Sequence, residues 1–245
     1  MSATSSDVSS SSAAASQQQE VKKKRVMVGL VGHTFSNQFI MSWTKFLVEC
    51  MKDGTIDISI FPGNSTFSTF SRMKTLGLTK QEVQTKAFDG VDYDVFLTVD
   101  SNVLFTYEDV KTLVGMTDKN PVVSGVYYTS EKTVHAVERM DYTNYGKTGT
   151  FPFVTKETME DLVDTKLMKV DYTGLGFFAC RRTVLQALDY PYFWYPLVDY
   201  ESEDGTPCKD VLTDEMAFCR RLCDKGYRIT LNTELRVHQE KEIFI

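Results

Sequence analysis

Hydrophobic residues along the chain follow two spacings in turn, and this pattern predicts an α/β architecture. Continuous apolar, β-branched runs at 26–31, 56–61 and 95–99 are typical of strands buried on both faces. Between the first two runs, Ser36 can cap a helix and Gly54 can end it. The apolar residues of that helix follow helical spacing: Phe39, Ile40, Trp43, Phe46, Leu47, Cys50 and Met51. The order strand, helix, strand is a βαβ unit, whose crossover is right-handed in nearly all proteins.

Three shorter helices are expected around the third strand. Phe67, Phe70 and Met73 recur every three residues, which predicts a short helix with Arg72 near its polar side. Capping boxes at 79–82 and 106–109 begin two further helices, the second reaching 114.

The second half of the chain predicts a mixed region and then a return to strands and helices. Residues 131–173 alternate short β-like runs with polar turns, among them the Gly-rich 144–149, and are expected to form a small antiparallel or mixed region. Residues 199–210 are acidic and turn-rich, which favours a long loop that is mobile or functional. The remaining elements are strands at 121–128, 174–180 and 227–231, and helices at 181–188 and 214–225, the last capped by Thr213.

Composition narrows the class of protein. Residues 1–24 form a Ser/Ala/Gln-rich segment too poor in large apolar side chains to fold, so we expect a disordered tail before a single domain at 25–245. The net charge of −6 argues against a nucleic-acid partner. Five scattered cysteines fit a reducing compartment, and no apolar run reaches the roughly 18 residues of a membrane span. The sequence therefore predicts a cytoplasmic protein.

The strongest candidate for chemistry follows the strand at 95–99. Asp100, Ser101 and Asn102 come directly after it, and ligands of open α/β sheets gather at the carboxyl ends of strands. An Asp and an Asn two residues apart can both aim oxygens at a hard cation or a ribose. The alternative is an Asx turn that ends the strand.

Several motifs follow one another in order along the chain. They are the strand and turn at 28–34, the polar segment 64–72 with its Arg, Tyr93-Asp94 leading into a DxD-like Asp100-Ser101-Asn102 and Pro121–Gly125, the Gly-x-Gly-Phe…Arg-Arg block at 173–182, and Asp214-Glu215 before Phe-Cys-Arg-Arg-Leu222 with a late His. In this order they resemble the small nucleotide-sugar glycosyltransferases of the GT-A fold, especially those carried by phages and large DNA viruses of algae. The resemblance covers about residues 26–240 and implies a Rossmann-like mixed sheet flanked by helices.

The resemblance also implies a metal site. In the family, the first Asp of the DxD motif touches the ribose or the metal and the last residue binds the metal. Those positions are Asp100 and Asn102 here, with His238 as a third ligand of Mn²⁺ or Mg²⁺. The neutral amide of Asn102 removes one full charge from the attraction for a cation. A solitary His near a chain end is equally consistent with a surface residue.

Asp214 and Glu215 are the candidate catalytic pair. By resemblance, one of them is the general base that takes the proton of the acceptor hydroxyl, and alignment puts Glu215 at the position of the family's Asp. The alternative is electrostatic, because acids in the first turn of a helix gain roughly 0.3–1 kcal/mol from its dipole.

The remaining candidates concern the two substrates. His33, Thr34, Arg72, Asp100 and Ser101 are expected at the nucleotide sugar, and Gly174 and Gly176 would let the backbone approach the sugar. A surface ion pair is the alternative for Arg72, and sheet packing is the alternative for the glycines. Trp194 and Tyr195 can stack on an acceptor sugar, although Pro-flanked aromatic residues are often core.

These residues predict a metal-dependent glycosyltransferase that moves a hexose from a UDP- or GDP-linked donor to a hydroxyl of a glycan or glycoprotein. The alternative is a non-catalytic sugar-nucleotide or glycan binding protein on the same fold, which Asn102 and the reversed Asp214-Glu215 order keep open. A nucleotidyltransferase ranks third, because 32–36 lacks a basic Gly-rich loop.

Overall fold

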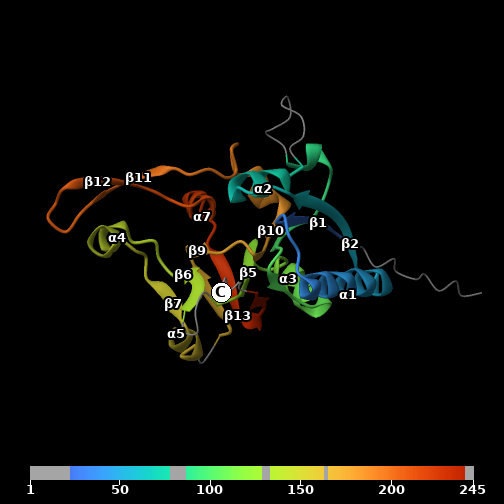
Figure 1. Ribbon diagram of the computed structural model, residues 1–245. Helices are drawn as coiled ribbons and strands as arrows, with labels where there is room; N and C mark the ends of the chain where they lie inside the picture. Colours follow the sequence, from blue (N-terminus) through green and yellow to red (C-terminus); the bar gives the residue numbers. More distant parts are fainter. Residues whose placement is uncertain (1–22, 78–86, 129–132, 163–164, 241–245) are drawn as a thin grey trace, which may run out of the picture.

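The computed structural model describes residues 23–77, 87–128, 133–162 and 165–240. Its centre is a seven-stranded mixed sheet in the order β2-β1-β3-β10-β5-β13-β8 (Figure 1). The first three strands in this order are parallel to one another, and β10 runs antiparallel between β3 and β5. The strands are β1 (Lys24–Val31), β2 (Ile56–Gly63), β3 (Val95–Asp100), β5 (Val122–Val126), β8 (Leu167–Val170), β10 (Phe177–Arg181) and β13 (Ile229–Arg236).

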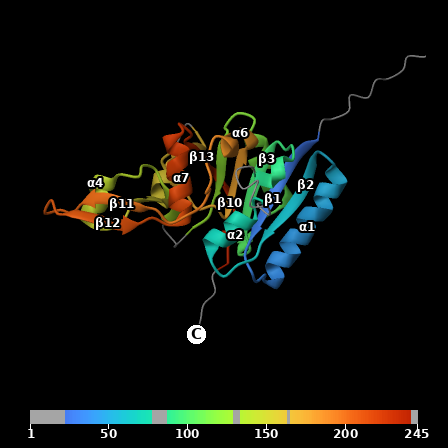
Figure 2. The same cartoon turned by 90° about the horizontal axis from the view of Figure 1, so that it is seen from above.

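Helices cover both faces of this sheet (Figures 1 and 2). One face packs against α1 (Asn37–Asp53) and α3 (Tyr107–Met116), and the other carries α2 (Ser68–Lys74), α6 (Arg182–Gln186) and α7 (Asp214–Asp224).

Alternation along β3 decides where the candidate aspartate points. Val95, Leu97 and Val99 belong to the apolar core beneath α1 and α3, whereas Phe96 belongs to the core beneath α7. Successive side chains of a strand point to opposite faces, so Asp100 shares its face with Phe96. The carboxylate therefore lies on the side of the sheet that α2 and α7 cover.

A second, three-stranded antiparallel sheet fills part of the region 131–173. Its strands are β6 (Thr133–Val137), β7 (Phe153–Thr155) and β9 (Tyr172–Thr173), in the order β7-β6-β9, and α5 (Lys156–Glu160) follows β7. The expected small antiparallel region is confirmed.

The Gly-rich stretch 144–149 is not a turn, and this expectation was wrong. It lies within α4 (Tyr142–Thr148), because Asp141 accepts hydrogen bonds from the first free N–H groups and Gly149 ends the helix with φ of 70°. Gly146 is required for another reason. A Cβ at this position would lie 1.9 Å from the carbonyl oxygen of Glu201, so only glycine lets the two segments meet.

The acidic segment 199–210 is also not a loop, contrary to expectation. It forms a hairpin of β11 (Leu197–Glu201) and β12 (Pro207–Val211), which lies beside α4 at the end of the molecule far from α1 (Figure 2). The Asp204 carboxylate accepts the Thr206 N–H at 3.0 Å, and Gly205 takes a φ of 79°. These turn contacts bring the strands together despite their mostly exposed side chains.

Helices whose sequences contain clear capping residues were predicted well. Ser36, Thr106 and Thr213 each cap a helix through the side-chain oxygen, and Gly54 ends α1 in the left-handed conformation. The last predicted strand is longer than expected, as β13, and a two-residue β14 (His238–Gln239) follows it and pairs with β4 (Val103–Leu104). The 79–82 capping box and residues 1–22 of the expected tail lie outside the described residues. Of the segment expected to form the helix after 79, the structure describes the last four residues, which form the 3₁₀ helix η2 (Ala87–Gly90).

Within the described ranges, no helix combines the length and apolar character needed to cross a membrane. All five cysteines have free thiols.

The end of α1 is tied to α3 through one carboxylate, and this contact makes stability depend on pH. Asp53 accepts hydrogen bonds from Thr55 and from the Tyr107 hydroxyl, and Lys111 lies 3.3 Å away. These contacts, the Thr55 and Tyr107 bonds foremost, lower the pKa of Asp53 to about 2. A carboxyl whose pKa is lower in the folded state stabilises the fold above its unfolded pKa of about 3.9, and this contribution is lost as pH falls.

We expect Asp53→Asn to be destabilising near pH 6 and neutral near pH 2. Denaturant unfolding of both proteins across this range measures the difference. A difference that stays constant with pH would contradict the assignment.

Candidate active site

Two turns meet at the carboxyl ends of β1 and β3. The Ser101 N–H donates to the carbonyl oxygen of Val31 at 2.7 Å, and Gly32, with φ of 143°, leaves room for the Ser101 side chain. A Cβ on Gly32 would lie 2.1 Å from Ser101 Oγ, so a larger residue would push the two turns apart. The strand ends therefore form one continuous floor, at the place where α/β sheets bind ligands.

A cleft of about 1050 Å³ opens above this floor. Six of the predicted site residues line it: His33, Thr34, Arg72, Asp100, Ser101 and Asn102. The volume lies at the upper end of the range for small-molecule and cofactor sites. These residues come from three separate segments, and the fold brings them together at one cleft.

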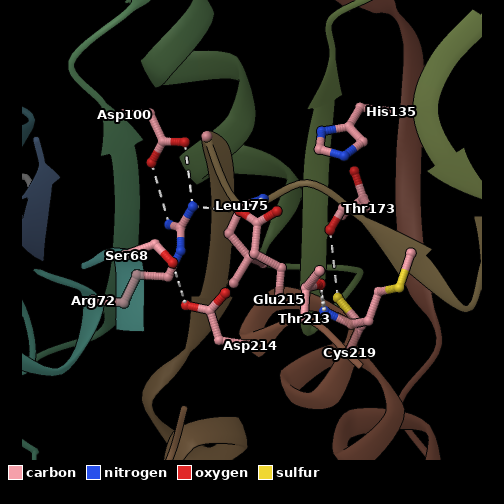
Figure 3. A network of polar contacts seen from close by, with 12 residues as sticks. Ser68, Arg72, Asp100, His135, Thr173, Leu175, Thr213, Asp214, Glu215 and Cys219 are labelled. Atoms are coloured by element: carbon pink, nitrogen blue, oxygen red, sulfur yellow. Dashed lines mark hydrogen bonds and ion pairs between the residues drawn. The ribbon is translucent and has the colours of Figure 1, made fainter. Parts of the chain in front are cut away.

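Arg72 lies at the centre of a buried ion-pair cluster, between Asp100 and Glu215 (Figure 3). Its Nη1 lies 3.2 Å from Asp100 Oδ1, its Nη2 donates to Asp100 Oδ2 at 3.2 Å, and Nη2 also donates to Glu215 Oε1. Only 4% of Arg72 is exposed. Burial disfavours the charged guanidinium, but Asp100, Glu215 and Asp214 outweigh this and raise its pKa above the ordinary value. Arg72 is therefore a fixed positive charge at the cleft.

The burial of Arg72 corrects the expected orientation of α2. Phe67, at its N-cap, and Phe70 are 64% and 61% exposed, whereas Ser71 and Arg72 are buried. The polar side of α2 faces the sheet because Arg72 pairs there with Asp100 and Glu215. Glycines on β1 and β2 leave space for the close approach of this end of the helix. Gly63 permits this approach, since a Cβ on it would lie 2.1 Å from the Ser71 carbonyl oxygen.

Glu215 and Asp214 begin α7 and both face α2, but they have different partners. Glu215 Oε1 accepts the Leu175 N–H at 3.1 Å as well as Arg72, and Oε2 faces the Tyr172 hydroxyl at 3.4 Å. Asp214 is 3% exposed and accepts a hydrogen bond from Ser68 Oγ at 3.1 Å. Glu215 is thus joined through Arg72 to Asp100, whereas Asp214 is joined to Ser68 (Figure 3).

The two candidate glycines occupy different surroundings. A Cβ on Gly174 would lie 1.8 Å from the Tyr127 hydroxyl oxygen and 2.4 Å from His135 Nδ1, so this glycine makes room for the chain's own side chains. Gly176 lies beside the site, because a Cβ there would be 3.1 Å from Asp100 Oδ2.

The C-terminal segment borders the same cleft, but His238 itself is exposed and pairs with Leu104 in the short β14–β4 sheet. The next residues, Gln239 and Glu240, line the cleft. The Glu240 N–H donates to the Asn102 carbonyl oxygen at 2.7 Å, and Ser36 Oγ donates to Glu240 Oε2 at 2.6 Å. Sequence reasoning placed a late residue at the Asn102 turn but did not identify Glu240.

Tyr195 and Trp194, the two aromatic candidates for binding the acceptor, have different surroundings in the structure. Tyr195 is 52% exposed, and its hydroxyl lies 3.1 Å from Ser68 Oγ, which also contacts Asp214. Trp194 is half-buried under the Arg221 guanidinium, 4.5 Å from the ring centroid. The structure therefore brings Tyr195 next to the carboxylate pair and gives Trp194 a packing contact.

Three further polar residues adjoin Glu215 and were not found from the sequence. Tyr172, His135 and Tyr127 follow one another in hydrogen-bonding distance behind the carboxylate. The available signal was His135 itself, a polar residue inside the β-branched run at 133–137. Their partners lie far away in sequence, which no local pattern reveals.

The cleft offers oxygen atoms that could bind a metal ion, but those of the described residues do not form a complete coordination site. In the part of the chain that the structure describes, no three His, Cys, Asp or Glu residues are grouped to hold a metal. Asp100 Oδ1 is buried without a directed hydrogen bond, and Asn102 and Glu240 line the same cleft. An all-oxygen set of this kind fits Mg²⁺ or Mn²⁺ that takes its remaining ligands from phosphate and water.

Known structures resemble this arrangement of strands and helices. GalNAc-T7, solved with UDP, GalNAc and Mn²⁺, matches 90% of this chain and 43% of its own at 10% identity, with a TM-score of 0.51. The fold is the GT-A fold. The match spans less than half of GalNAc-T7, so it concerns one part of that protein.

Two other similar structures match with lower TM-scores. A197 from STIV matches 91% of this chain and 96% of its own at 14% identity, with a TM-score of 0.45. 4-Diphosphocytidyl-2C-methyl-D-erythritolsynthase from Anaerococcus prevotii DSM 20548 matches 92% and 93% at 13% identity, with a TM-score of 0.39. No protein-family model matches the sequence, and no curated protein is similar to it.

Proposed function

We propose that this chain is a glycosyltransferase that moves a hexose from a UDP- or GDP-linked donor to a hydroxyl of a glycan or glycoprotein. The observation that carries the proposal is the Asp100–Arg72–Glu215 cluster at the border of a large cleft on a GT-A fold. It supplies a fixed cation for a diphosphate and a carboxylate for a hydroxyl proton within one network. Free cysteines fit the cytoplasmic location expected from the sequence.

Arg72 is suited to hold the donor's anionic group. Its Nε is buried without a hydrogen bond, and its Nη1 has only the ion-pair contact with Asp100 Oδ1 at 3.2 Å, so the guanidinium retains N–H donors for an added acceptor. A guanidinium fork binds phosphate oxygens in pairs, and a desolvated cation stabilises negative charge strongly. His33, Thr34 and Ser101 line the adjoining wall and are assigned to the nucleotide.

Glu215 is assigned as the general base, which accepts the acceptor's proton as the hydroxyl oxygen attacks the anomeric carbon. Asp214 and Tyr195 both contact Ser68, and they are assigned to the acceptor side. Asp100 and Asn102, with His238 on β14, which pairs with the strand β4 that follows Asn102, would hold Mn²⁺ or Mg²⁺. When bound, the metal supplies positive charge against the departing diphosphate.

Donor binding tests this proposal most directly. Calorimetry with UDP- and GDP-sugars should show binding that Mn²⁺ strengthens by about 5–150-fold, the usual range for coupling between two ligands, and Asp100→Ala should abolish this strengthening. The matched control is Asp199→Ala, an exposed carboxylate on β11 that pairs with Lys209. Absence of binding to every donor, with and without metal, would reject the proposal.

The second candidate is a sugar-nucleotide or glycan binding protein without catalysis. It is favoured by Asn102, which weakens the metal site, and by the engagement of both Glu215 oxygens in the free protein. Donor binding without hydrolysis or transfer in any acceptor screen would support it.

A further inference from the structure

A chain of polar side chains runs behind Glu215, away from the cleft. It begins with the Tyr172 hydroxyl, 3.4 Å from Glu215 Oε2, and continues to His135 Nε2, 2.8 Å from that hydroxyl. His135 Nδ1 then lies 3.2 Å from the Tyr127 hydroxyl, which also accepts the Gly176 N–H at 3.3 Å. The residues come from β9, from β6 and from the segment after β5.

The number of protons on these side chains determines the direction in which the hydrogen bonds are donated. A neutral imidazole has one donor and one acceptor nitrogen, and each tyrosine hydroxyl has one proton. If Tyr127 donates to His135 Nδ1, then Nε2–H donates to the Tyr172 oxygen, and Tyr172 donates to Glu215. Every proton then has an acceptor, and Glu215 Oε2 has a donor.

The opposite direction leaves two groups unmatched. His135 Nδ1–H would donate to Tyr127, and the structure gives the Tyr127 hydroxyl no other side-chain partner among the described residues. Tyr172 would donate to His135 instead, and Glu215 Oε2 would lose its hydrogen bond. Buried polar groups without partners are costly, so the first direction is the stable one.

The surroundings keep His135 neutral. Burial lowers the pKa of His135 and outweighs the nearby Glu215 and Asp100, which raise it, while Arg72 lowers it further. Rings of Tyr127, Tyr172 and Phe153 lie around the imidazole, with centroids 5.5, 5.5 and 6.1 Å away. The two nitrogens therefore keep distinct donor and acceptor roles.

We propose that His135, as its Nε2–H tautomer, is a positioning residue that directs the Tyr172 hydroxyl proton onto Glu215 Oε2. This inference rests on the proposed function, with Glu215 as the base. The two hydrogen bonds to Oε1 hold that oxygen firmly, whereas the 3.4 Å contact to Oε2 is the longest of the three. Oε2 is thus the less firmly held of the two oxygens, and the direction of the Tyr172 proton decides how the Glu215 carboxylate is oriented.

Kinetics of matched variants test the positioning role. His135→Phe keeps a ring but loses both polar nitrogens, and we expect about tenfold lower kcat with the donor KM unchanged, the effect of one oriented hydrogen bond. His135→Gln retains one donor and one acceptor and should restore most of kcat. His135→Phe should add nothing in a Tyr172→Phe background. Equal losses in the Phe and Gln variants, or none in the Phe variant, would overturn the proposal.

The tautomer can be measured without any substrate. Two-bond proton–nitrogen NMR of the full chain, with His135 assigned by its absence in His135→Gln, should show a neutral ring protonated at Nε2 at pH 7. A ring protonated at Nδ1, or an imidazolium, would overturn the proposal. If the protein turns over no donor at all, the proposed function fails, while the tautomer measurement still decides the direction of the hydrogen-bond chain.

Discussion

Arg72→Leu is expected to lower the free energy of unfolding by about 3–5 kcal/mol at neutral pH, because it leaves two desolvated carboxylates without their cation. Arg72 contacts both Asp100 and Glu215, which are themselves 21% and 15% exposed. Denaturant unfolding of the variant measures the loss. Donor binding should also disappear, since the fixed charge at the cleft is removed.

The control for this variant is Arg25→Leu. Arg25 also pairs with two carboxylates, Asp92 and Asp94, but its side chain is 42% exposed. Exposed ion pairs are worth little, so we expect a loss of about 1 kcal/mol or less. Adding Glu215→Gln to Arg72→Leu should recover part of the loss, since one uncompensated charge is removed. Equal losses of unfolding free energy in the two Arg variants would show that the buried cluster stabilises the fold no more than an exposed ion pair does.

Glu215→Gln is expected to lower kcat by about 10²–10⁴-fold, the usual contribution of a general base, with donor affinity retained. The substitution keeps the size of the side chain and a carbonyl oxygen for the Leu175 N–H and Arg72. Initial rates of transfer and donor calorimetry on the same preparation separate catalysis from binding.

Asp214→Asn is the matched control for that variant. Its carboxylate is equally close to α2 but bonds to Ser68 rather than to Arg72. We expect a smaller loss of kcat than for Glu215→Gln. A larger loss would assign the base to Asp214, a choice that the reversed order of the pair left open in the sequence.

Local signals explain what the sequence predicted correctly. The capping oxygens of Ser36, Thr106 and Thr213 act within three residues, and the buried runs of β1 and β3 have a composition that few other environments favour. The position of Asp100 at a strand end, where it lines the cleft, follows from those runs. The strand pattern and the motif order together gave the GT-A fold.

The site's interior depended on contacts that local patterns do not contain. The burial of Arg72 could not be predicted, because its carboxylate partners lie 28 and 143 positions further along the chain. The contacts of His135 were missed for the same reason, since Tyr172 lies 37 positions away. The hairpin at 197–211 was missed because its exposed strands lack the hydrophobic alternation on which strand prediction depends.

The pairing of β14 with β4 affects the order in which the walls of the cleft form during synthesis and folding. Ser36 and Glu240, which meet across the cleft, are separated by 204 positions in the sequence. A contact of such high sequence separation forms only after the intervening chain has been ordered, and its loop-closure entropy slows folding. During synthesis the strands β1 and β3 emerge long before residues 239–240. The cleft therefore acquires its last wall only after residue 240 has been synthesised, and a nascent chain that stops before it would carry the charged cluster without this wall.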